Sequence, residues 1–116
     1  MYHFIMLDCA AATNTFYVSM PYDALLKGAT WVAGADPGAN KTMVLSHDTA
    51  GATIVSGDIS ATAGTAVVGT VTATLADANL VLNSTTAPLK IVATTSNACK
   101  VCLTLDIDEF VRPKKA

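Results

Sequence analysis

The chain has 116 residues, which fits one domain with a single core, because domains commonly contain about 100–150 residues. Its formal net charge is −2 and only 14% of its residues are charged, well below the roughly 25% of an average soluble domain. This balance gives no strong field to attract a nucleic acid or an anionic membrane, so we expect neither as a partner. The low charge either reflects a surface that a neighbouring protein covers or is simply that of an alanine- and threonine-rich β domain.

The opening segment, MYHFIMLDCAAA, makes a poor secretion signal, because it lacks a basic start and Asp8 interrupts its short apolar run. No apolar run approaches the roughly 18 residues that a membrane-spanning helix needs. The three cysteines cannot all pair with one another. Reduced thiols in a protein assembled inside a cell are therefore the simplest expectation.

Short apolar segments separated by Gly, Asn, Asp and Pro follow one another along the chain, which is typical of an all-β domain. Residues 3–8 and 14–20 are the first candidate strands, and residues 22–27 carry the only helical character. The later candidate strands are 29–35, 41–47, 51–60, 64–75, 79–84, 87–95 and 98–111. We expect a single-domain β-sandwich or jelly roll of about seven to nine short antiparallel strands, with at most one short helix near residues 22–27.

The sequence suggests three parts. Residues 1–15 form an N-terminal segment, residues 16–111 the β-sandwich domain, and residues 112–116 a short basic tail. The tail is either solvated or in contact with an acidic partner.

Residues 99–108 show the clearest strand alternation in the chain, with apolar residues at 99, 101, 103, 105 and 107 and mostly polar ones between them. Because successive side chains of a strand point to opposite faces, the C-x-x-C spacing of Cys99 and Cys102 separates the two thiols. A redox pair of this spacing would lie at a helix N-terminus, and a zinc site would need two more ligands, which Cys9, His3 and His47 do not supply as a second pair. We expect Cys99 in the core and Cys102 facing outward.

The remaining chemical candidates are weaker. The acidic cluster of Asp106, Asp108 and Glu109 could provide paired carboxylates, but solvent-facing acids at the end of a strand are commoner. Ser, His and Asp at 46–48 are consecutive and cannot form a spatial triad. The segment ADPGANKT at 35–42 lacks the glycines of a phosphate-binding loop, and its Asp-Pro-Gly indicates a turn. We therefore expect no catalytic residue, no metal and no cofactor, and a protein that is not an enzyme.

Three segments give a recognisable layout of strand, turn, strand and a final alternating strand. They are GATWVAGADPGANKTMVLSHD, ATLADANLVLNS and KIVATTSNACKVCLTLDID. This layout resembles the small capsid decoration (cement) proteins of tailed bacteriophages, which have a jelly-roll or β-sandwich fold. The resemblance covers most of residues 16–110 and is one of strand order and composition.

The resemblance implies a structural virion protein that is made in the bacterial host cytoplasm, binds the major capsid protein on the outer capsid surface and stabilises the shell, often as a homotrimer. The N-terminal segment is too apolar to extend freely into water, so it either packs on a neighbouring subunit or the capsid, or forms the first strand of its own domain. In the first case, deleting residues 1–8 abolishes assembly. The candidate assembly interface is Tyr2, Phe4, Ile5, Leu7, Arg112, Lys114 and Lys115.

The main alternative is a phage adhesin domain or a carbohydrate-binding β-sandwich module. An exposed Trp31 beside a concave polar groove would favour that alternative. A single tryptophan on a strand is more often a core residue, and we expect this for Trp31.

The predicted directions of the two thiols can be tested by serine substitution. Cys99→Ser should destabilise the protein by about 1–3 kcal/mol, because a buried hydroxyl is left imperfectly satisfied. Cys102→Ser should leave the free energy of unfolding unchanged. Urea unfolding of both variants measures the difference, and equal effects would show that the two cysteines share one environment.

Overall fold

The best-patterned strand of the sequence lies inside one of the two sheets of the fold. The computed structural model of the chain describes residues 2–20, 22–72, 80–83 and 87–109. Strand β9 (Cys99–Glu109) buries Cys99, Val101, Leu103, Leu105 and Ile107 on one face, whereas the side chains between them are exposed or half-buried. The predicted alternation is confirmed, and with it the opposite directions of Cys99 and Cys102.

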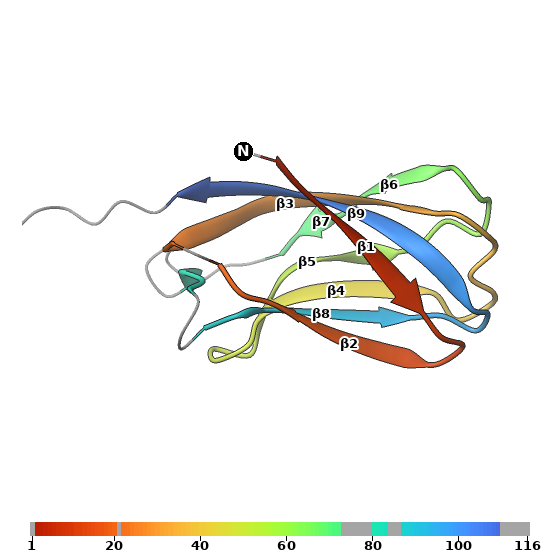
Figure 1. Ribbon diagram of the computed structural model, residues 1–116, viewed down its shortest axis with the longest axis horizontal. Coiled ribbons are helices and arrows are strands. Elements are labelled where there is room, and N and C mark those ends of the chain that lie inside the picture. The colour runs from red at the N-terminus through yellow and green to blue at the C-terminus, as the bar shows by residue number, and fades with distance from the viewer. Residues whose placement is uncertain (1, 21, 73–79, 84–86, 110–116) are drawn as a thin grey trace, which may run out of the picture.

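The described residues form nine strands in two antiparallel sheets (Figure 1). One sheet has four strands in the order β1-β9-β3-β6, and the other has five in the order β2-β8-β4-β5-β7. Besides β9, the strands are β1 (Tyr2–Cys9), β2 (Thr13–Val18), β3 (Ala24–Ala33), β4 (Thr42–His47), β5 (Ala52–Asp58), β6 (Ala66–Val68), β7 (Thr70–Val71) and β8 (Leu89–Thr94). The predicted β-sandwich of seven to nine strands is therefore correct.

The pairing pattern makes this sandwich a jelly roll. Strand β1 pairs with β9, β2 with β8, β3 with β6, and β4 with β5, all antiparallel. These are the pairs of one long antiparallel ribbon, wound so that β1, β2, β3 and β4 alternate between the two sheets. Strand β7 adds to the outer edge of the second sheet by pairing with β5.

The N-terminal segment is part of this sandwich. Strand β1 pairs with β9 over eight consecutive residues without a bulge, and β2 forms an edge of the other sheet. The expected boundary between residues 15 and 16 thus falls inside β2. The segment 22–27, where the sequence allowed a short helix, is strand from Ala24 onward because its apolar residues lie beside β9.

No α-helix occurs in the described residues. Across the same residues, no helix is long and apolar enough to cross a membrane.

Trp31 lies in the core between the two sheets, as expected from its place on a strand. Its side chain is 1% exposed, and its indole N–H donates to the Asp58 carbonyl oxygen at 3.0 Å. The chain passes close over the ring at Gly69, between β6 and β7. A Cβ atom built at Gly69 would meet the Val55 side chain and would lie 2.7 Å from Trp31 Cη2. The position therefore has no room for a side chain.

The close passage over Trp31 predicts a large difference between two Gly→Ala substitutions in the same sheet region. Gly69→Ala should destabilise the protein by about 1–3 kcal/mol, because the added methyl overpacks the core. Gly28→Ala is the matched control, since a Cβ there meets nothing within 4 Å, and its effect should stay within about 0.5 kcal/mol. Chemical unfolding of both variants checks the prediction, which is wrong if the two destabilise equally.

Candidate functional site

The face of the four-stranded sheet that points away from the core carries exposed large apolar side chains on its two edge strands, with threonines between them. Asp8 and Lys100, which are opposite each other in the β1–β9 register, put charged side chains at one end of the same face. The strand register places its side chains in rows. One row is Phe4, Thr104, Thr30 and Val68, and the next is Met6, Cys102, Val32 and Ala66. Tyr2 and Asp106 lie side by side at one end of these rows. We call these ten residues the outer face.

The outer face is exposed as well as apolar. Phe4 is 74% exposed, Met6 62% and Val68 77%. Six large hydrophobic side chains of the described residues are exposed, and four of them belong to the outer face. A contiguous set of exposed apolar side chains on one face is the usual mark of a surface that another molecule covers.

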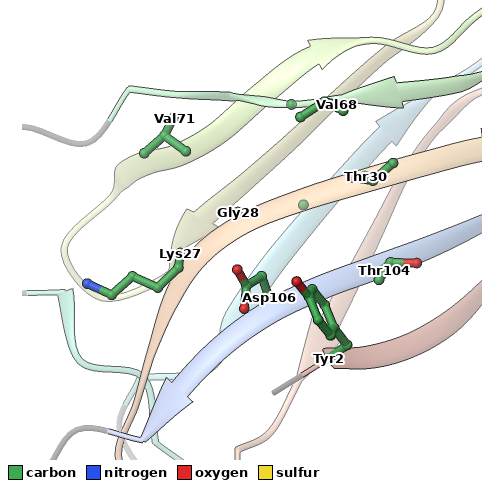
Figure 2. A pocket seen from close by; sticks show the side chains of 10 residues that line it. Tyr2, Lys27, Gly28, Thr30, Val68, Val71, Thr104 and Asp106 are labelled. Atoms are coloured by element: carbon green, nitrogen blue, oxygen red, sulfur yellow. The ribbon is translucent and has the colours of Figure 1, made fainter.

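The outer face is hollowed beside Tyr2. A pocket of about 280 Å³ is lined there by Tyr2 and Asp106 on one side and by Val68 and Val71 on the other, over the small residue Gly28 (Figure 2). The Tyr2 hydroxyl points towards Asp106, and Lys27 extends away from the centre of the pocket. The carboxylate of the predicted acidic cluster is thus placed at the end of an apolar surface.

The structure separates the residues of the predicted assembly interface into two groups. Tyr2 and Phe4 point outward from β1, whereas Leu7 is 2% exposed and packs in the core, with Ile5 half-buried beside it. Arg112, Lys114 and Lys115 lie outside the described residues. Met6 belongs with Tyr2 and Phe4 and was missed, although a strand period of two, applied to residues 2–6, identifies it.

A pair of thiols on the opposite face of the sheet was also missed. Cys9 is the last residue of β1 and Cys99 the first of β9, and the two are direct partners in the strand register. Both point into the core, where Cys9 is 1% exposed and Cys99 7%. The C-x-x-C therefore has its thiols on opposite faces, and the neighbour of Cys99 is a cysteine from the other end of the chain.

Burial and mutual proximity govern the acidity of these thiols. Burial, followed by the nearby Cys99 and Asp8, raises the pKa of Cys9 from 9.0 to about 11. Burial also raises the pKa of Cys99, against a hydrogen bond from Thr95 that lowers it. Both groups are therefore protonated, neutral thiols at neutral pH.

His47, from the Ser-His-Asp stretch, has a structural role. It is 6% exposed, and its ring accepts the Ala50 backbone N–H at Nδ1 over 2.9 Å. Since Nδ1 is an acceptor, Nε2 carries the proton and donates to the Val81 carbonyl oxygen at 3.0 Å. The two ring nitrogens thus link the end of β4 to the turn at Ala50 and to the segment at Val81 by hydrogen bonds.

The Asp-Pro-Gly segment forms the connection from β3 to β4, as expected. Gly38 has a φ of +94° and donates its N–H to the Asp36 carboxylate at 2.9 Å. The Pro37 carbonyl oxygen accepts the N–H groups of Ser96 and Asn97, which ties this loop to the one between β8 and β9.

The acidic residues on β9 do not assemble into a metal site in the part of the chain described. Asp106 and Asp108 lie on the same side of β9, as the alternation predicts. Among the described residues, no three His, Cys, Asp or Glu side chains are grouped so as to hold a metal ion.

No known protein family, curated protein or solved structure matches the chain.

The raised pKa of Cys9 predicts a loss of stability in alkaline solution. Between pH 9 and about 11 the unfolded chain releases this thiol proton while the folded chain retains it, so stability falls as pH rises through that window. Cys9→Ala should flatten the decline, because it removes this thiol and leaves the rest of the chain unchanged. Urea unfolding across this pH range provides the measurement, with Cys102→Ser as control. Identical slopes for wild type and Cys9→Ala would contradict the pKa shift.

Proposed function

We propose that this chain is a structural virion protein that binds the outer surface of a phage capsid, through the major capsid protein, and stabilises the shell without catalysis. The observation that carries the proposal is the outer face, which exposes Tyr2, Phe4, Met6 and Val68 together. A protein whose role is to cover another protein needs such a surface. Burying it stabilises the complex by about 25 cal/mol for each Å² of apolar area removed from water.

The low charge of the chain supports the same role. Only 14% of its residues are charged, so two surfaces of this kind can approach each other with little repulsion or desolvation of charge. The resemblance in strand order to capsid decoration proteins supplies the identity of the partner in this proposal. The same resemblance supplies the homotrimeric state and the virion as location.

The form of the edge strands adds a second reason to expect neighbours. Strand β1 is an edge of its sheet and has eight residues, whereas the opposite edge, β6, has three. Proteins commonly protect a long edge with charged side chains, proline or a bulge, and β1 has one exposed charged residue, Asp8 near its end, and neither proline nor a bulge. A long, apolar and regular edge strand is protected when another protein lies against it.

The carbohydrate-binding alternative has lost the feature that would have favoured it. Its expected sign was an exposed Trp31 beside a polar groove, and Trp31 is 1% exposed and packed between the sheets. Glycan binding is therefore one of the results that the capsid-binding experiment below distinguishes.

Co-sedimentation with empty capsids of a phage that encodes the chain tests the proposal. Phe4→Ser should weaken capsid binding by about tenfold or more, because Phe4 is the most exposed aromatic ring among the described residues and belongs to the proposed contact. Tyr17→Ser is the matched control: Tyr17 is 59% exposed on β2, at the edge of the other sheet, and its loss should leave binding unchanged. Point variants are preferable to deleting residues 1–8, since the deletion also removes Leu7 from the core.

Light scattering on the same samples distinguishes a loss of capsid binding from a loss of the proposed trimer. A Phe4→Ser protein that remains a trimer but no longer sediments with capsids identifies the outer face as the shell contact. Capsid binding equal to that of wild type would remove the outer face from the proposal. A wild-type monomer that ignores capsids and binds glycans would replace the proposal with the adhesin alternative.

A further inference from the structure

We propose that Cys9 and Cys99 form an intramolecular disulfide when the folded protein meets a small disulfide oxidant such as oxidised glutathione. The bond would link the edge strand β1 covalently to β9. This inference does not depend on the proposed function, because it concerns the core side of the sheet.

The strand register brings the two cysteines to the required separation. Residues directly opposite each other in an antiparallel pair have Cα atoms about 4.5–5.5 Å apart, within the roughly 4.4–6.8 Å range of disulfides. Cys9 and Cys99 are opposite in this sense, and both point into the core. Each lies at an end of its strand, where the backbone can adjust more readily than in the middle of the ladder.

Hydrogen bonds hold the chain on both sides of the pair. The Thr95 hydroxyl donates to the Ala10 carbonyl oxygen at 2.9 Å, which links the residue after Cys9 to the loop before Cys99. The Ala10 N–H donates to the Asn14 side-chain oxygen at 3.1 Å. The two thiols are therefore kept as neighbours by contacts outside the β1–β9 ladder.

Cys102 cannot take the place of Cys9 in this bond. It lies on the outer face, opposite Met6 and Val32, so the sheet itself separates it from the other two thiols. The short sequence spacing between Cys99 and Cys102 therefore misidentifies the partner.

The chemistry consists of two thiol–disulfide exchanges. Cys99 is the more accessible thiol of the pair, and its thiolate attacks one sulfur of oxidised glutathione, which breaks the S–S bond and releases one glutathione. The Cys9 thiolate then attacks the Cys99 sulfur and releases the second glutathione. In total the two protein thiols lose two electrons and two protons, and oxidised glutathione gains them as two thiols.

The bond would join the two ends of the fold. It closes a loop of roughly 90 residues, and a cross-link of that length restricts the unfolded chain strongly. Strand β1 has a single neighbour in its sheet, so it is a strand whose detachment the bond would oppose directly.

The test uses the full chain, incubated with oxidised glutathione at mildly alkaline pH, then denatured and treated with iodoacetamide. The expected product has lost two hydrogen atoms and carries one alkylated thiol, at Cys102. Trypsin cuts after Lys100 and so separates Cys99 from Cys102. The non-reduced digest should therefore contain peptide 1–27 linked to peptide 91–100. Formation should speed up as pH rises, because the thiolate is the nucleophile and the pKa of Cys9 is about 11.

Two variants complete the test. Cys102→Ser should form the same linked peptide, and its melting temperature should rise by about 5 °C or more on oxidation. Cys9→Ser should give no linked peptide and no rise. The proposal is overturned if the wild type stays fully reduced, if only Cys102 is modified, or if the linked peptides come from two different copies of the chain.

Discussion

The fold depends on the burial of one face of β9. This strand lies between β1 and β3, and its inward side chains from Cys99 to Ile107 pack in the core between the two sheets. Shifting β9 by one residue would turn all of these side chains into water, so the hydrophobic effect fixes its register. Once that register is fixed, the positions of β1 and β3 follow from hydrogen bonding to β9. The outer face is therefore a consequence of core packing, because each outward residue is placed by its inward neighbours.

The sequence predicted those features that local patterns determine. The alternation of residues 99–108, the all-β class and the burial of Trp31 each follow from a strand period or a residue type, and each is correct. The segment 22–27 has apolar residues compatible with a short helix, and only the neighbouring β9 makes it a strand. Tertiary pairing overrides weak local propensity in such short segments.

The candidate site was less predictable because it combines both ends of the chain. Nothing near Cys9 or Cys99 in the sequence indicates that the first strand pairs with the last, so the thiol pair could not be deduced from spacing. Likewise, the outer face joins side chains of β1, β9, β3 and β6, which only the sheet order brings together. Tyr2 and Phe4, which were named from the apolar character of one segment, are exposed, and their role in an assembly interface stays a prediction. Leu7, which was named with them, is buried, and predicting this needed knowledge of which face of that segment is inside.

The two faces of strand β1 have different roles. Its outward residues Tyr2, Phe4 and Met6 offer an apolar surface, and as an edge strand it presents backbone groups that another strand could pair with. Its inward residues Leu7 and Cys9 hold it in its own sheet by packing in the core, at the end of the strand that is continuous with the Ala10–Ala12 corner. An apolar surface on an edge strand can act as a specific contact only while the strand stays in register, since slippage by one residue would exchange the two sets of side chains. The anchoring of the inner face is thus the physical condition for any function of the outer one.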